Sequence, residues 1–297
     1  MKTIVAVLAL AASAAAPCAL TAQDVDTTIV VRSGARFDLN SVSGTVKIQT
    51  WGRPQIRVVA QSDGARVTVD ASPGGVSVRT VPRRGEGDVD FTITVPASTS
   101  LEVHAISADV EANGVCGEAT LGSISGGVTL RCGNGNVQIE SVSGDVQASD
   151  VRGNLEITST SGDVEARGVH GDVNARSVSG DVSLDRVDGK SVGAETVSGD
   201  IGFSGPVHDD GRYRFRSHSG DVTVRPDGDL SAYISVSTFS GDVESDWPMT
   251  INPGGGPVRP REWEFTIGGG SAKLTLESFS GTIYLRRNGA ASRRGDR

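Results

Sequence analysis

One six-residue phrase recurs through the middle of the chain at a nearly constant interval. Between Ser123 and Phe203 it reads SISGGV, SVSGDV, STSGDV, SVSGDV and TVSGDI. Successive glycines in these phrases lie 18, 18, 18 and 19 residues apart: Gly126, Gly144, Gly162, Gly180 and Gly199. A weaker glycine falls midway in each interval, so the underlying unit has nine residues. A short, fixed period is typical of a solenoid, in which each unit buries its apolar side chains against its neighbours.

Small or apolar residues occupy every second position within a unit, as in Val142, Gly144, Val146 and Ala148. This alternation predicts a half-buried β-strand, and its phase slips at a two-residue corner. An antiparallel meander would also alternate, but the near-identical register and the scarcity of hairpin turns favour stacked coils. We therefore expect an all-β chain. Its fold class is a parallel β-solenoid, or β-helix, of nine-residue strand-plus-corner units, two per 18-residue coil, with irregular β caps.

The flanks of the repeat array define the other expected segments. Lys2, an apolar stretch from Ile4 to Ala16 and a small-residue end at Ala22 are typical of a secretory signal peptide. No later stretch approaches the roughly 20 apolar residues that a membrane helix needs. We expect a signal peptide at 1–22, an irregular β entry and capping region at 23–101, a β-solenoid repeat domain at 102–287 with an insertion at 246–264, and a disordered basic tail at 288–297.

This leader predicts export to the periplasm, the outer surface or the extracellular space, with no membrane span. Cys116 and Cys132 remain after cleavage, and an even pair of cysteines in an oxidising compartment commonly forms a disulfide. On an 18-residue coil, Cys132 lies only two residues out of register with Cys116, which is within reach of disulfide geometry. We expect this bridge to staple the start of the array. The net charge of −8 argues against nucleic acid as a partner, because nucleic-acid binding requires a basic face.

An aspartate follows most of the strong glycines, and stacking would align these aspartates in a row. The candidates for a cation are Asp145, Asp163, Asp181 and Asp200. Calcium is the cation that suits such oxygens, although the nonapeptide calcium repeat has a different spacing. The alternative is structural: the aspartates keep the outer face polar and bond the backbone at the corner. We favour this alternative and expect no cofactor, with Ca²⁺ left open.

The insertion contains the other candidate ligand-binding residues, Trp247 and Trp263, among four prolines. Aromatic side chains dominate binding hot spots, so these two residues are candidates for contacting a partner. They are equally suited to sealing the end of the core, which is the interpretation that we favour. The cluster of His208 with Asp209 and Asp210 is the remaining polar group of interest.

Three segments carry a family resemblance. The chain enters the array with VPASTSLEVHAISADVEA, continues through the SGDV phrases and closes with FTIGGGSAKLTLESFSGTIYL. In this combination it resembles a bacterial family of unknown function called putative adhesin, or β-strand-repeat proteins, and it is similar to auto-transporter adhesin head domains. The resemblance implies a β-solenoid at the cell envelope or surface. It implies no catalytic residues.

Function is less constrained than fold. A repeated aspartate is unlike the unique constellation of an active site, so we expect no enzyme and no catalytic residue. The expected function is a non-catalytic adhesin or structural scaffold that binds a cell-envelope or surface component, whether glycan, peptidoglycan or protein. One alternative is a sensory or regulatory binding module of the envelope, and another is a carbohydrate-active β-helix enzyme. The oligomeric state is not fixed by the sequence.

Overall fold

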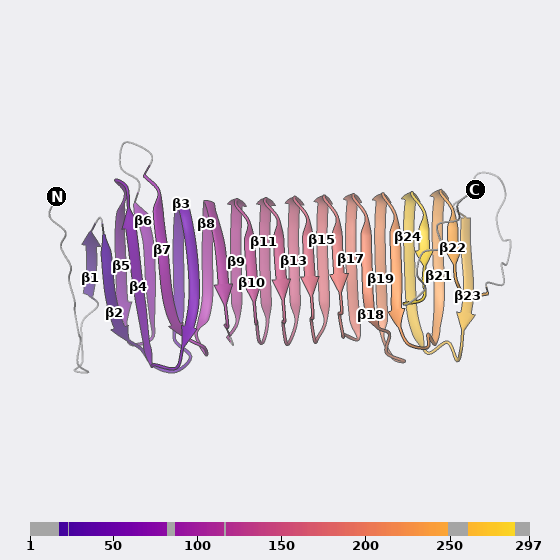
Figure 1. Ribbon diagram of the computed structural model, residues 1–297, viewed down its shortest axis with the longest axis horizontal. Coiled ribbons are helices and arrows are strands. Elements are labelled where there is room, and N and C mark those ends of the chain that lie inside the picture. Colours follow the sequence, from indigo (N-terminus) through magenta and orange to yellow (C-terminus); the bar gives the residue numbers. More distant parts are fainter. Residues whose placement is uncertain (1–17, 23, 82–86, 116, 249–260, 289–297) are drawn as a thin grey trace. The chain divides into compact units, whose positions relative to one another are not determined.

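The computed structural model describes residues 18–22, 24–81, 87–115, 117–248 and 261–288. Regular structure in these residues consists of β-strands. No helix in the described segments is long and apolar enough to cross a membrane. The chain divides into two compact units, Met1–Gly162 and Asp163–Arg297. The many short strands, most of them paired in parallel, confirm the predicted all-β, solenoid-like fold class (Figure 1).

Unit 1 begins with longer strands and continues into short, regular ones. Its described strands are β1 (Cys18–Ala22), β2 (Val25–Val30), β3 (Arg36–Trp51), β4 (Gln55–Ser62), β5 (Arg66–Ser72), β6 (Gly75–Val81), β7 (Val89–Pro96), β8 (Ser100–Asn113), β9 (Ala119–Ser125), β10 (Val128–Arg131), β11 (Val137–Ser143), β12 (Val146–Ser149) and β13 (Leu155–Ser161).

Unit 2 begins with regular coils and ends in a more elaborate arrangement. Its described strands are β14 (Val164–Arg167), β15 (Val173–Ser179), β16 (Val182–Asp185), β17 (Ser191–Ser198), β18 (Ile201–Pro206), β19 (Arg212–Ser219), β20 (Val222–Asp227), β21 (Ala232–Ser240), β22 (Val243–Ser245), β23 (Arg261–Ile267), β24 (Ala272–Ser280) and β25 (Ile283–Leu285).

The regular coils repeat with the predicted 18-residue register. Val137 of β11 pairs in parallel with Leu155 of β13 on one side and with Ala119 of β9 on the other. Each coil contributes two strands, as β11 and β12 do, joined by the corner at Gly144. Equivalent residues of successive coils therefore stack in rows, which is the arrangement expected of a parallel solenoid.

The core is formed by the inward phase of each strand, and one detail of the predicted alternation is wrong. Ile139 and Val146 are fully buried, as period-two alternation requires. Val142 is 46% exposed although the alternation placed it inside with Val146. The chain changes phase between Ser141, which is buried, and Val146. The corner turns Val142 outward because the backbone must reverse there.

The entry region of unit 1 is irregular but contains one coil-like strand. β2, β4 and β7 pair antiparallel, as do β1, β5 and β6. The long strand β3 instead runs parallel to β8, from Arg36 opposite Ser100 to Ile48 opposite Ala112. Its centre reads SVSGTV and aligns with AISADV of β8. A copy of the repeat phrase is thus present in the entry region. The similarity of SVSGTV to the SGDV phrases is the sequence signal that indicates this coil-like strand.

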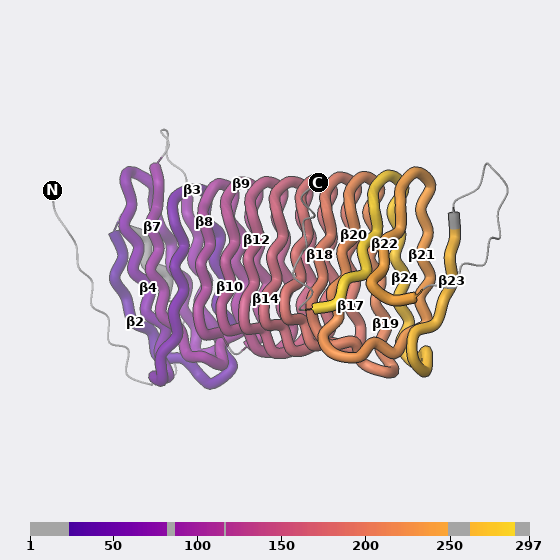
Figure 2. The backbone as a smooth tube through the Cα atoms, turned by 45° about the vertical axis from the view of Figure 1, so that its right-hand side comes forward, coloured from indigo at the N-terminus to yellow at the C-terminus, as the bar shows by residue number. Residues whose placement is uncertain are grey.

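The last coil of unit 2 is inserted out of sequence order. β24 pairs in parallel with both β19 and β21, and β25 pairs with both β20 and β22. The yellow β24 accordingly lies between the orange β19 and β21 (Figure 2). β23 first runs back antiparallel along the other edge of β21. The chain then returns to fill the place between β19 and β21, which the glycine spacing alone did not predict.

Close stacking at the corner leaves no room for a side chain on Gly199. A Cβ on Gly199, whose φ is +156°, would lie 2.1 Å from the carbonyl oxygen of Gly180. We expect Gly199→Ala to lower the free energy of unfolding by at least about 2 kcal/mol, because the rungs must separate to admit the methyl group. Gly202 in the same coil has open space around its Cα, so Gly202→Ala should change stability by less than about 1 kcal/mol. Denaturant unfolding of both variants provides the comparison, and equal losses would contradict it.

Candidate functional site

The aspartates of the SGD corner bond the backbone of the next coil. In each of these bonds an amide N–H donates to the Oδ1 of the aspartate one coil earlier. The bonds are Asp181 N to Asp163 (2.9 Å), Asp200 N to Asp181 (2.8 Å), Asp221 N to Asp200 (2.8 Å), Thr282 N to Asp221 (2.7 Å) and, in unit 1, Gly127 N to Asp109 (2.8 Å). The row of carboxylates is therefore part of the ladder that holds the coils in register.

This arrangement bears on the calcium candidates. Asp163, Asp181 and Asp200 each use one carboxylate oxygen to accept a backbone N–H. Among the described residues, no group of three or more His, Cys, Asp or Glu side chains is placed to hold a metal ion. Asp145 of unit 1 occupies the same position in its phrase, and it also has an interaction partner. The geometry favours the structural role of Asp163, Asp181 and Asp200, and cation binding at all four candidates stays a prediction.

The two serines of each phrase have different environments. The first is buried, and in some phrases its hydroxyl donates to a glycine carbonyl at the corner, as Ser141 does to Gly144 at 3.1 Å and Ser217 to Gly199 at 3.0 Å. The buried hydroxyls of Ser159 and Ser177 have no hydrogen-bond partner among the described residues. The second, such as Ser143, is exposed. Only the second hydroxyl of each phrase therefore faces outward.

Between these two serines lies a row of exposed apolar side chains, which we call the corner ridge. In unit 1 it comprises Ile106, Ile124 and Val142, and in unit 2 it comprises Val178, Val197, Phe279 and Phe239. Each of these side chains is 46–50% exposed. Thr160 and His218 occupy equivalent positions, so the fold accepts a polar residue there. The apolar character of the ridge is therefore not required for folding.

The ridge becomes aromatic at the end of unit 2. His218, Phe279 and Phe239 come from β19, β24 and β21, and their rings stack at centroid distances of 4.7 Å. Beside them lies a shallow groove of about 270 Å³. Arg216 lines this groove and forms ion pairs with Glu277 at 2.7 Å and Glu195 at 3.8 Å. The site thus joins stacked rings to a paired charge network, a combination that sequence reasoning missed because it depends on the insertion of β24.

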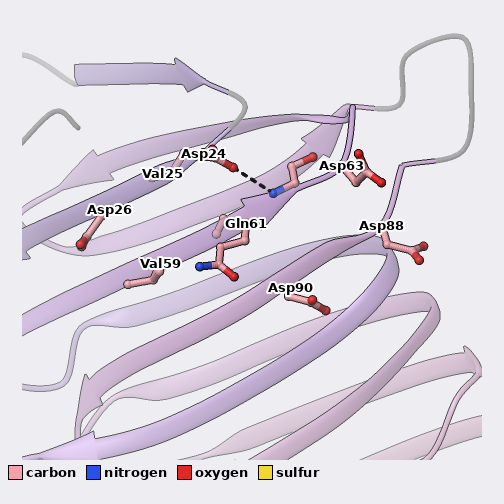
Figure 3. Close-up of a pocket in the computed structure, with 10 residues that line it drawn as sticks. Asp24, Val25, Asp26, Val59, Gln61, Asp63, Asp88 and Asp90 are labelled. Atoms are coloured by element: carbon pink, nitrogen blue, oxygen red, sulfur yellow. Dashed lines mark hydrogen bonds between the residues drawn. The ribbon is translucent and has the colours of Figure 1, made fainter. Parts of the chain in front are cut away.

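Unit 1 has a second depression, of about 560 Å³, with an acidic lining (Figure 3). Its aspartates are Asp24, Asp26, Asp63, Asp88 and Asp90. Three of them already bond protein groups: Asp24 accepts from Ser62 N, Asp26 pairs with Arg57, and Asp90 accepts from Thr45 N. The hydrogen bond of Asp26 to Arg57 lowers the pKa of that carboxyl.

His208 pairs with an aspartate from the preceding coil. Its Nε2 lies 2.6 Å from Oδ1 of Asp188, and His170 Nδ1 lies 3.5 Å from the other oxygen. The hydrogen bond from His208 lowers the pKa of Asp188 against the opposing effect of burial, and His170 adds to the lowering. The neighbouring Asp210 instead pairs with Lys190 at 2.8 Å. These pairs join adjacent coils through the segments between their strands.

The two tryptophans of the insertion lie in different environments. Trp263 belongs to β23, opposite Val236 and in phase with the buried Phe265, so it faces the core. Trp247 is half-buried, and the guanidinium of Arg287 lies 5.3 Å from its ring centroid. The position of Trp263 favours the sealing role. Residues 249–260 of the insertion lie outside the described residues.

The predicted disulfide stays a prediction, because Cys116 lies outside the described residues. Cys132 is exposed and forms no disulfide with any residue that the structure describes. It occupies a corner position with φ of 58°, stacked against Asp150 with φ of 55° in the next coil. The left-handed backbone at both residues shows that the conformation of this second corner repeats from one coil to the next.

Comparison with known proteins agrees with the architecture. The Toastrack DUF4097 family model matches residues 81–286, which is more than half of the chain. The chain belongs to the Toastrack DUF4097 family. This membership confirms the β-repeat family resemblance seen in the SGDV phrases.

A solved structure gives a more distant likeness to this Toastrack chain. It is a putative cell adhesion protein from Clostridium sporogenes, similar at 10% sequence identity over 92% of this chain and 100% of that chain, with a TM-score of 0.25. No curated protein shows a significant match.

The aspartate ladder makes a prediction about stability. Asp200→Ala removes the acceptor of the Asp221 N–H, and we expect a loss of about 1–2 kcal/mol in the free energy of unfolding. Asp200→Asn keeps an acceptor oxygen at the same place and should lose less than half as much. Millimolar calcium should leave the melting temperature of the unmodified chain unchanged. A calcium-dependent rise that Asp200→Asn abolishes would instead establish a metal site.

The His208 contact makes a prediction about acid stability. Because the pKa of Asp188 is lowered below its usual 3.8 on folding, its contribution to stability is present above pH 3.8 and is lost as the pH falls through the lowered value. In His208→Ala the pKa of Asp188 should rise toward 3.8, as measured by NMR titration of the carboxyl carbon. The pKa of Asp26, which depends on Arg57, serves as the control and should not move. An unchanged Asp188 titration would refute the assignment.

Proposed function

We propose that this Toastrack protein is an exported, non-catalytic binding scaffold that attaches to a component of the cell envelope or of a cell surface. The corner ridge is the observation that carries this proposal. A run of exposed apolar side chains in a regular row marks an interaction surface more often than chance exposure does. Since Thr160 and His218 are accepted in the same row, folding alone does not account for the apolar residues.

The surroundings of the ridge suit a partner with both polar and apolar faces. The exposed second serines, such as Ser143, lie on one side of each ridge residue, and the corner aspartates follow them in sequence. At the aromatic end, stacked rings adjoin the Arg216 ion-pair network. Glycans, peptidoglycan and protein segments all present this mixture of groups.

The repeated polar residues do not compete with this role. Asp163, Asp181 and Asp200 bond the backbone of the next coil, so they serve the ladder. The leader at residues 1–22 supports export. The envelope sensory module remains the alternative, and it would use the same ridge if its ligand were a peptide.

Attachment through the aromatic end can be tested with isolated cell-envelope fractions and a glycan panel, with and without calcium. We expect the double variant Phe239→Ser/Phe279→Ser to bind at least about 10-fold more weakly, because the aromatic anchors supply much of the contact energy. Tyr233→Ser is the matched control, since Tyr233 is 37% exposed on the same strand but outside the ridge.

The same assay separates the candidate functions. Calcium-independent, saturable binding that the double variant loses supports the scaffold. Unchanged binding by the double variant overturns the role of the ridge. Turnover of a polysaccharide by the purified protein would overturn the non-catalytic proposal.

A further inference from the structure

We propose that removal of the leader uncovers the edge of β5 and that this edge pairs with β5 of a second copy to form a symmetric dimer. The inference rests on the proposed export in one respect, namely cleavage after Ala22. It concerns a surface of unit 1 remote in sequence from the aromatic end of the ridge.

The leader occupies a strand position in the structure. β1, residues Cys18–Ala22, pairs antiparallel with β5, from Ala22 opposite Val67 to Cys18 opposite Ala71 (Figure 1). The other edge of β5 pairs with β6. Cleavage after Ala22 removes the whole of β1 from the chain. β5 then becomes an edge strand with one row of unpaired backbone N–H and C=O groups.

Such an edge is a template for another strand. An unpaired row of backbone groups over seven residues is the feature that proteins usually shorten, charge or cover. Val67 and Val69 face the core and are 0% and 1% exposed, so the edge also adjoins apolar side chains. A strand that replaces β1 would satisfy the backbone and keep these valines covered.

The sequence of β5 is complementary to itself in one register. An antiparallel pair centred on Thr68 sets Arg66 opposite Asp70 of the partner subunit, and Asp70 opposite the partner's Arg66. Val67 then lies opposite the partner's Val69 on the core face. Arg66 and Asp70 are both exposed, so the two charge pairs form on the solvent side of the sheet.

Other registers lose this match. Centring the pair on Val67 or Val69 sets the charged residues opposite uncharged ones: Arg66 then faces a threonine or a serine, and Asp70 a glycine or a threonine. Opposite charges directly across an antiparallel pair are favourable, and like charges are unfavourable. A two-fold axis through Thr68 also uses the same patch on both subunits and leaves neither β5 edge open. The second copy is therefore the occupant that charge and symmetry favour.

The test compares two forms of the full chain. The chain expressed with its leader in an exporting bacterium is purified from the exported fraction, and mass spectrometry establishes its N-terminus. The same chain produced in the cytoplasm retains residues 1–22. Sedimentation equilibrium should give a dimer for the form that begins at Gln23 and a monomer for the form that keeps β1. A monomeric exported form, or an exported form that keeps β1, overturns the proposal.

Charge reversal identifies the interface. Arg66→Asp and Asp70→Arg each set like charges opposite one another at two symmetric places, so each should weaken dimerisation at least about 10-fold. The double variant Arg66→Asp/Asp70→Arg restores both pairs and should return the dissociation constant to within about 3-fold of the original value. Arg152→Asp, an exposed arginine of the regular coils, is the control and should have no effect.

These outcomes are independent of the envelope assay. Single variants that dimerise normally, or a double variant that fails to recover while remaining folded, overturn the β5 interface. Envelope binding by a monomeric protein would overturn this inference and leave the proposed function in place. A β5-dependent dimer that binds no envelope component would support this inference and overturn the proposed function.

Discussion

The contact between successive corners governs the rest of this structure. At the corners of unit 2, Gly199 lies against the carbonyl oxygen of Gly180 and Gly220 against that of Gly199, and the carboxylates of Asp181 and Asp200 each accept the N–H of the next coil. Both interactions require a fixed distance between coils and a fixed register. This constraint explains the short period of the sequence. A larger residue at the position of Gly199 would bring its side chain against a backbone carbonyl.

This constraint also decides which residues are available for function. The glycine and the aspartate of the phrase contact or bond the neighbouring coil, as Gly199 and Asp181 do, so their repetition is explained by the ladder. The ridge residue does not take part in this stacking, because its side chain is exposed at the corner. An apolar residue at that position is therefore informative in a way that the repeated aspartate is not. The same logic explains why a repeated carboxylate is weak evidence for a metal site.

The terminal strands of the two units are arranged differently. In unit 2 the chain reverses through β23 and inserts β24 between β19 and β21, so that the final coil is covered on both sides. In unit 1 the edge of β5 is covered by β1, which belongs to the expected leader. A covering strand that export removes would couple maturation to assembly. An exposed edge strand can pair with a strand of another molecule, and the uncovered β5 would be such an edge.

The sequence by itself determined the strand-and-corner unit, the 18-residue register and the family, because these depend on contacts between neighbouring coils whose spacing is written in the repeat. It also pointed to the sealing role of Trp263. Only the tertiary structure decided that Val142 lies outside, that β3 carries an early SVSGTV strand beside β8, and that β24 lies between β19 and β21. The aromatic stack of His218, Phe279 and Phe239 followed from that insertion. A period specifies which residues stack on the next coil. It does not specify that β24 is the neighbour of β19, because these strands lie far apart in the sequence and their pairing depends on the packing of the whole unit.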